Sequence, residues 1–335
     1  MSITIFSSPI GLGHATRDIA IASKLPTTPK FVSGEGAARL IAKYGYSVIN
    51  AYSPNKFSVK FGTLQHSFRW LLSYYLYYRK CRAAARRFLS QNGGLVVADE
   101  DFASLAIAQE LKRPCILITD ITQTHFTSGL AFMVEQRMNE RMHRLIDRCD
   151  CVIIPDNGDN SGNKMYVGPI VREASDSREQ LRKIFRFDRV TILLCVGGTD
   201  AGQFLIEKAT EAYRKLRIDA ELVIVSGPSL SLPDSEDYRN MGFVDNLHEL
   251  ILASDLVVSL AGRSTMDECI ASGTPGIFIP IKSHFEQERG AARLGFKHED
   301  VYRLEKLMAE KVTSRNSPSK VNGAGVAAKI ISSYL

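Results

Sequence analysis

The sequence lacks the features that mark a disulfide scaffold, a zinc site or a membrane span. Its six cysteines show neither zinc-ligand nor disulfide spacing, and Cys149 and Cys151 stand closer than the partners of a CxxC pair. No apolar run approaches the roughly 18 residues that a transmembrane helix needs. No leader of basic, apolar and small residues precedes the first expected strand at Ser2. These absences predict a cytoplasmic protein with reduced cysteines and no bound metal.

Two nucleotide-binding fingerprints are also absent or incomplete. No glycine precedes a Lys-Ser or Lys-Thr pair at the spacing of a P-loop. The turn after the first strand reads GLGH, and Thr16 stands where a dinucleotide-binding GxGxxG needs its third glycine. A nicotinamide enzyme with Glu35 as its ribose-binding acid therefore remains only an alternative. The net charge of +6 permits an anionic substrate or membrane surface and does not require nucleic acid as a partner.

What the sequence does contain is a sustained alternation of short apolar runs and amphipathic segments. A chain of 335 residues is long for a single hydrophobic core. The alternation predicts an α/β protein with two Rossmann-like parallel-sheet domains. We place the N-terminal domain at residues 1–168, the C-terminal domain at 169–317 and a terminal helix within 318–335.

The most informative stretch runs from Ser254 to Gly290. Leu256–Leu260 has the apolar, β-branched pattern of a buried parallel strand, and Gly262 permits a tight turn after it. Ser264 and Thr265 are N-cap types at the start of the next helix. Such an N-terminus attracts phosphate through its N–H groups and the helix dipole. Acids that could accept hydrogen bonds from sugar or ribose hydroxyls follow it: Glu268, Glu286 and Glu288.

This segment resembles the donor-nucleotide signature of GT-B glycosyltransferases, in particular the lipid-II-forming N-acetylglucosaminyltransferase and UDP-glycosyltransferase families. The resemblance implies two Rossmann-like domains facing across a cleft, with the last helix packing back on the N-terminal domain. It also implies a UDP-sugar as donor, with no metal or other cofactor. In the late loop this chain has Gln287 followed by Glu288, where the lipid II enzymes favour two glutamines, so the donor sugar stays open.

The resemblance also implies roles for residues of the second half. Glu268 takes the ribose hydroxyls, and the backbone of Phe243 and Val244 selects uracil. The loop GGT lies under the donor. Apart from the resemblance, the helix that begins at Ser264 and Thr265, together with Arg263, could stabilise the charge on the leaving diphosphate. The expected donor-binding residues are Gly197, Gly198, Thr199, Ser226, Phe243, Val244, Gly262, Arg263, Ser264, Thr265, Glu268, Glu286, Gln287 and Glu288.

The GLGH turn is similar to the acceptor-side loop of the same families. His14 would begin the first helix, where the helix dipole favours a neutral imidazole that can act as a general base. The alternative is a histidine that only caps its helix. We expect Gly11, Gly13 and Arg17 on the acceptor side.

Three acids follow buried strands whose carboxyl ends should share one edge of the sheet: Asp99, Asp101 and Asp120. One of them could orient the imidazole of His14 as in a His–Asp pair. We choose Asp120 for this role, and its alternative is to cap the following helix.

Residues 56–89 are rich in aromatic and basic side chains. A helix from about Leu64 would place Trp70, Leu71, Tyr74, Tyr75 and Tyr78 on one broad face. This helix could face the core, with its last basic residues complementing its dipole. It could also form a peripheral membrane contact at the cytoplasmic face, where a lipid-linked acceptor would approach. Stacking on single-stranded nucleic acid is a third alternative.

Together these features favour an inverting, metal-independent glycosyltransferase that moves a hexose, for example N-acetylglucosamine, from a UDP-sugar to an acceptor hydroxyl. A UDP-sugar hydrolase or a UDP-sugar 2-epimerase would share every motif. A non-enzymatic nucleotide-sugar-binding subunit is a further alternative.

Overall fold

The computed structural model describes residues 1–54, 59–60, 62–64, 68–121, 123–124, 130–197, 202–233, 235–319 and 321–335. The chain divides into two compact units, each formed by separate segments of the sequence. The first unit contains Met1–Asn55, His66–Val171 and Val321–Leu335, and the second contains Lys56–Gln65 and Arg172–Lys320. The boundary expected at residue 168 compares with a second unit that resumes at Arg172, and Lys56–Gln65, expected in the N-terminal domain, belong to the second unit.

The first unit is built on a seven-stranded parallel sheet of order β3-β2-β1-β6-β7-β8-β9. Its strands are β1 (Ile3–Ser7), β2 (Lys30–Gly34), β3 (Val48–Tyr52), β6 (Leu95–Asp99), β7 (Cys115–Ile118), β8 (Cys151–Ile154) and β9 (Lys164–Tyr166). Its helices are α1 (Gly13–Ala22), α2 (Glu35–Lys43), α3 (Phe68–Leu89), α4 (Phe102–Glu110), α5 (Leu130–Asp147) and α12 (Ala324–Ser332).

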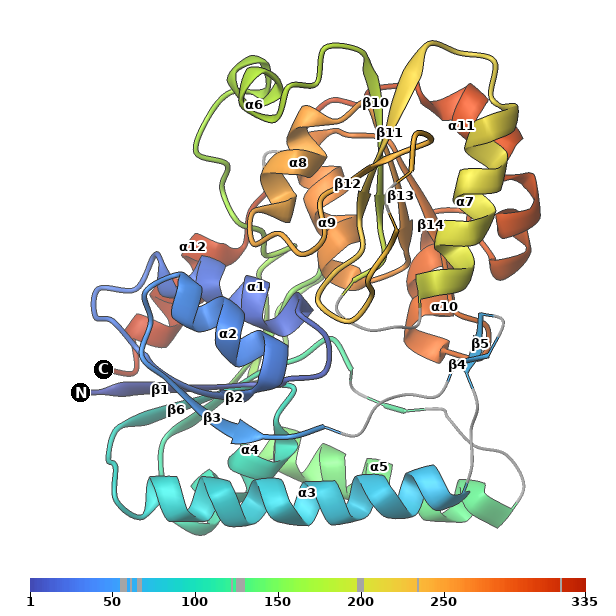
Figure 1. Ribbon diagram of the computed structural model, residues 1–335. Helices are drawn as coiled ribbons and strands as arrows, with labels where there is room; N and C mark the ends of the chain where they lie inside the picture. Colours follow the sequence, from blue (N-terminus) through green and yellow to red (C-terminus); the bar gives the residue numbers. More distant parts are fainter. Residues whose placement is uncertain are drawn as a thin grey trace. The chain divides into compact units, whose positions relative to one another are not determined.

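Helices cover both faces of this sheet, which explains why its central strands are apolar throughout (Figure 1). Successive side chains of β1 point to opposite faces, so Ile5 packs with α1, α2 and α12 while Phe6 packs with α3 and α4. The final helix α12 buries an i, i+3, i+4, i+7 stripe in the first of these cores: Ala324, Ala327, Ala328 and Ile331.

The helix expected in the aromatic and basic segment is α3, and its described side chains face both the core and solvent. Cys81, Ala85 and Leu89 are buried at helical spacing against the sheet, as a core-facing helix requires. Tyr75 is 55% exposed and Leu76 is 50% exposed. The side chains of Trp70 and Leu71 lie outside the described residues. The core-facing interpretation is therefore confirmed for the second half of α3.

The second unit is built on a five-stranded parallel sheet of order β12-β11-β10-β13-β14. Its strands are β10 (Val190–Cys195), β11 (Ala220–Val225), β12 (Arg239–Asn240), β13 (Leu256–Leu260) and β14 (Gly276–Ile279), beside the antiparallel pair β4 (Val59–Lys60) and β5 (Thr63–Leu64). Its helices are α6 (Arg178–Phe185), α7 (Gln203–Lys215), α8 (Leu247–Ala253), α9 (Arg263–Ser272), α10 (Phe285–Arg293), the 3-10 helix η2 (His298–Arg303) and α11 (Leu304–Lys311).

The short pair β4–β5 joins the second unit through backbone hydrogen bonds. Leu64 donates its N–H to the carbonyl of Lys282, and Lys282 donates to the carbonyl of Gly62. These contacts explain why a segment that precedes α3 belongs to the unit of the C-terminal half. Among the described helices, none is both long enough and apolar enough to cross a membrane.

The burial of α12 generates a stability prediction. Replacing the fully buried Ile331 by Ala should lower the free energy of unfolding of the first unit by about 2–5 kcal/mol, because it removes apolar contacts and leaves a cavity. The matched control Val326→Ala, on the exposed side of the same helix, should change it by less than about 0.5 kcal/mol. Urea unfolding followed by the fluorescence of Trp70, the one tryptophan, measures both. Equal effects of the two variants would contradict the packing of α12.

Candidate functional site

The first cluster of functional side chains lies where α1 begins. Gly11 adopts a φ of +77°, in the left-handed region that favours glycine, and a Cβ there would meet nothing within 4 Å. Helix α1 begins at Gly13, so His14 is in its first turn, with 23% of its side chain exposed. Its Nδ1 lies 3.0 Å from Oδ1 of Asp99, which is the last residue of β6.

Arg17 holds this carboxylate from the next turn of α1. Its Nε donates to Oδ2 of Asp99 at 2.8 Å, and its Nη2 bonds to Oδ1. Both side chains are buried. Burial alone would raise the pKa of Asp99, but the charges and hydrogen bonds of Arg17 and His14 lower it below its ordinary value. Asp99 is therefore an ionised acceptor at neutral pH.

The charge of Asp99 decides the tautomer of His14. A carboxylate can only accept hydrogen bonds, so the contact with Asp99 places a proton on Nδ1 of His14. The Nε2 atom then carries the lone pair. Although Nη2 of Arg17 lies 3.2 Å from Nδ1, it cannot donate to a nitrogen that already bears a proton. The arrangement presents an imidazole whose basic nitrogen is Nε2 and which a buried carboxylate orients.

The choice of Asp120 as the partner of His14 is wrong, because Asp99 occupies that place. Asp120 instead lies with its Oδ1 3.9 Å from Nη1 of Arg17. Asp101 caps α4 by accepting hydrogen bonds from the backbone N–H groups of Ala103 and Ser104. The strand order explains the outcome: β6 is the neighbour of β1, and Ser7 at the end of β1 pairs with Asp99.

The second cluster lies where α9 begins, in the second unit. Gly262, not Ser264 or Thr265, is the N-cap residue. A Cβ at Gly262 would meet nothing within 4 Å, so open space lies beside this helix N-terminus. Such a terminus suits a phosphate group. Ser264 and Thr265 belong to the first turn of the helix.

Gly197 provides a similar opening at the end of β10. It adopts a φ of +81°, and a Cβ there would also meet nothing within 4 Å. Its expected partners Gly198 and Thr199 lie outside the described residues.

Glu268 lies on α9 in a buried ion pair that the sequence did not reveal. Its Oε1 lies 3.1 Å from Nη2 of Arg172, and the two side chains are only 6% and 5% exposed. Burial raises the pKa of Glu268, and the charge of Arg172 opposes this shift. Nη1 of Arg172 donates to the carbonyl of Asp245 at 2.5 Å. Arg172 therefore connects the acid expected at the ribose to the loop of Phe243 and Val244, expected at the base.

Two expected donor-binding side chains have other partners within the second unit. Ser226 is fully buried, and its hydroxyl donates to the carbonyl of Leu230 at 3.1 Å. The role of Ser226 in donor binding stays a prediction. Nε of Arg263 donates to Oδ2 of Asp267 at 2.8 Å, one helical turn along α9. Phe243 is 38% exposed, whereas Val244 packs against the core.

The late acidic segment begins a helix and is not the loop that the sequence suggested. Glu286, Gln287 and Glu288 lie in the first turn of α10, which starts at Phe285. Gln287 accepts a hydrogen bond from the N–H of Ile281, and Glu288 accepts one from the N–H of Ser283, both at 3.0 Å. These bonds fix the turn between β14 and α10. Among the described residues, no group of three or more His, Cys, Asp or Glu side chains could hold a metal ion.

Comparison with known proteins shows which family model and which fold the chain is similar to. Residues 192–315 match the family model of the glycosyltransferase family 28 C-terminal domain. The glycotransferase of kitacinnamycin has a similar structure, with a TM-score of 0.66 at 14% identity over 100% of this chain and 99% of that one. The fold is the GT-B fold. The expected fold class, two Rossmann-like parallel-sheet domains, is confirmed.

Curated relatives extend the similarity to sequence. An uncharacterised glycosyltransferase of Methanopyrus kandleri is 29% identical over 63% of this chain and 64% of its own length. A UDP-N-acetylglucosamine–N-acetylmuramyl-(pentapeptide) pyrophosphoryl-undecaprenol N-acetylglucosamine transferase of Geobacillus thermodenitrificans is 29% identical over 51% of this chain and 51% of its own. The chain is similar in sequence to these two glycosyltransferases, and it spans about half to two thirds of their length.

The buried pair of Arg172 and Glu268 generates a prediction about stability. Arg172→Met should lower the free energy of unfolding by roughly 3–5 kcal/mol, because it leaves Glu268 buried without its cation. The double variant Arg172→Met/Glu268→Gln should recover a large part of that loss. The exposed pair Arg189–Asp219 is the control, and Arg189→Met should cost less than about 1 kcal/mol. Chemical unfolding checks all three, and a double variant no more stable than the single one would contradict the pairing.

His248 lies in the same charge environment and generates a prediction about pH. Burial and the charge of Arg172 lower the pKa of His248 to about 4. The unfolded chain therefore binds a proton below about pH 6.5 that the folded chain does not bind until about pH 4. The free energy of unfolding should fall on acidification, by up to about 2 kcal/mol at pH 5, and His248→Phe should lose this contribution. NMR titration of His248 measures the pKa directly, and a midpoint near 6.5 would refute the shift.

Proposed function

We propose that the chain is an inverting glycosyltransferase that moves a sugar from a UDP-sugar to an acceptor hydroxyl. The observation that carries the proposal is the hydrogen bond between Nδ1 of His14 and Asp99, which leaves Nε2 as a base at the start of α1. The matched family 28 C-terminal domain supports a nucleotide-sugar donor in the second unit. The name of the Geobacillus relative supports UDP-N-acetylglucosamine as the first donor to test.

The proposed reaction needs one general base, which accepts the proton of the acceptor hydroxyl. The acceptor hydroxyl gives its proton to Nε2 of His14 while its oxygen bonds to the anomeric carbon. The bond from that carbon to the diphosphate breaks, UDP leaves, and the configuration inverts. General base catalysis of this kind contributes roughly 10²–10⁴-fold to the rate. Asp99 stabilises the imidazolium that forms, because its charge lies 3.0 Å from Nδ1.

The second unit would bind the donor through the groups at the carboxyl ends of its strands. The N-terminus of α9, beside the open space at Gly262, would stabilise the charge that develops on the leaving diphosphate without a metal. Glu268, held by Arg172, would accept the ribose hydroxyls, and the backbone of Phe243 and Val244 would bind the uracil edge. Gln287 and its acidic neighbours would contact the sugar.

We also propose a lipid-linked acceptor and a peripheral membrane contact. The name of the Geobacillus relative includes a pyrophosphoryl-undecaprenol acceptor. On this chain, exposed apolar side chains of α3 and α5 supply a surface of the required kind: Tyr75, Leu76, Met133, Val134 and Met138.

Kinetics of variants in the His14 cluster test the proposal. His14→Ala and Asp99→Asn should each lower kcat by about 10²–10⁴-fold, because the first removes the base and the second removes the charge that orients it. The dissociation constant for the donor, measured by calorimetry, should not change. The exposed His143→Ala on α5 is the control and should keep full activity.

The screen pairs UDP-, GDP-, ADP- and dTDP-sugars with polyprenyl-phosphate-linked acceptors. Inverted product from a UDP-sugar supports the proposal. Near-normal turnover of His14→Ala would show that His14 is not the general base. Rapid release of free sugar without an acceptor would instead identify a hydrolase.

A further inference from the structure

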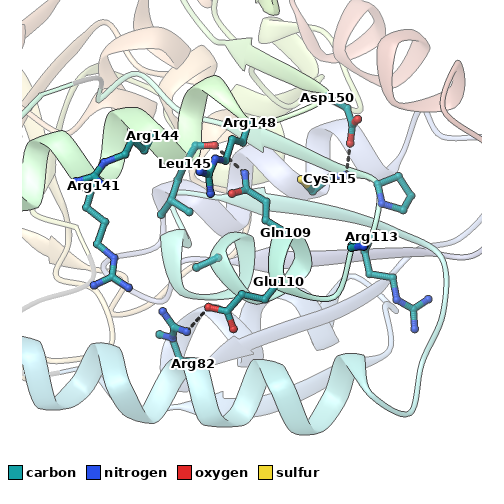
Figure 2. A pocket seen from close by; sticks show the side chains of 13 residues that line it. Arg82, Gln109, Glu110, Arg113, Cys115, Arg141, Arg144, Leu145, Arg148 and Asp150 are labelled. Atoms are coloured by element: carbon teal, nitrogen blue, oxygen red, sulfur yellow. Dashed lines mark hydrogen bonds and ion pairs between the residues drawn. The ribbon is translucent and has the colours of Figure 1, made fainter.

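A second feature of the first unit is a cavity of about 820 Å³, and Figure 2 shows the side chains that line it. Pro114 and Cys115, at the start of β7, line it together with Asp150, which precedes β8. In a parallel sheet the strand starts lie at the edge opposite the carboxyl ends. The cavity is therefore separate from the cluster of His14 and Asp99, and its volume suits a small ligand.

The lining of this cavity is strongly cationic. Six basic side chains line it against two acidic ones: Arg82, Lys112, Arg113, Arg141, Arg144 and Arg148, facing Glu110 and Asp150. Both acids already have partners. Glu110 is bonded to Arg82 and Arg86, and Asp150 accepts the N–H of Cys115 at 2.8 Å. The two acids can therefore offset only two of the six positive charges on the lining.

Ordinary helix capping explains only part of this charge. Arg113 donates to the carbonyl of Leu89 at the end of α3, and Arg144 donates to the carbonyl of Glu140 within α5. The side chains of Lys112, Arg141 and Arg148 have no hydrogen bond or ion pair with any residue that the structure describes. A helix C-terminus carries only about half a negative charge, which is too little for this number of cations.

The arginines of α5 repel one another where they stand. Arg141, Arg144 and Arg148 are spaced three and four residues apart, so they share one face of the helix. Like charges at this spacing destabilise a helix. An anion bound between α5 and the neighbouring elements would pair with these guanidinium groups and so relieve their repulsion.

One further detail fits a ligand. Lys112 adopts a φ of +52°, a left-handed conformation that glycine or asparagine would adopt at lower cost. The turn therefore keeps a cation at a position where glycine or asparagine would be less strained.

We propose that this cavity binds a small polyvalent oxyanion of the pyrophosphate or bisphosphate class. Arginines from α3, α5 and the start of β7 would surround its phosphate groups, and several guanidinium groups match more than one phosphate. The site does not depend on the proposed function, because it contains none of the residues of either cluster described above.

Calorimetry with pyrophosphate tests the site on the full chain, and the variants of α5 distinguish this site from binding elsewhere on the chain. We expect saturable binding that weakens with rising salt. Arg144→Gln/Arg148→Gln should weaken it at least tenfold. The control Lys80→Gln/Arg87→Gln removes two exposed charges from α3 away from the cavity and should leave binding unchanged. If the double variant of α5 does not fold, as judged by circular dichroism, Arg141→Gln replaces it.

Parallel titrations distinguish the source of the anion. Inorganic phosphate should bind more weakly than pyrophosphate, because it engages fewer arginines. Vesicles of phosphatidylcholine with phosphatidylglycerol test a lipid headgroup as the source. The vesicles could bind more strongly than pyrophosphate and lose that binding in the α5 variant. This result would identify a lipid headgroup, and not a free anion, as the ligand, and it would overturn the proposal. Absence of saturable pyrophosphate binding, or equal loss in the α3 control, would also overturn it.

Discussion

The buried carboxylate of Asp99 constrains the whole amino-terminal half of the first unit. It ends the strand beside β1 and has no exposed surface, so it needs a cation at a fixed place. Arg17 supplies that cation from α1, and the two hydrogen bonds fix the rotation of the helix about its axis. His14, three residues earlier, is held against the same carboxylate. One ion pair thus aligns a strand, a helix and the candidate base.

The same principle operates in the second unit, with an ion pair that joins segments far apart in sequence. Arg172 and Glu268 are 96 residues apart, yet they are buried together, and Arg172 also bonds the backbone of Asp245. The acid on α9 and the loop before α8 are therefore held in one arrangement. Both units use an arginine to fix an acid, and each arginine comes from a segment that local sequence patterns do not connect to that acid.

This explains what the sequence could and could not predict. The alternation of apolar strands and amphipathic helices was enough to predict two parallel sheets. The turn at Gly262 was recognisable from its local sequence. Asp99 could not be chosen over Asp120, because the choice depends on which strand neighbours β1, and no local pattern encodes strand order. Ser226 looked available in the sequence, but its hydroxyl bonds to a carbonyl four residues away. The roles of the remaining candidate residues stay predictions.

Helix α12 has a consequence for how the chain acquires its structure during synthesis. The first core needs Ala327, Ala328 and Ile331, although its sheet is complete by Tyr166. A ribosome therefore produces residues Arg172–Lys320 of the second unit while the surface of α1 that α12 will cover remains open to water. Until α12 has been synthesised, the nascent first unit stays incomplete, and chaperones that bind apolar surface could bind it during that interval.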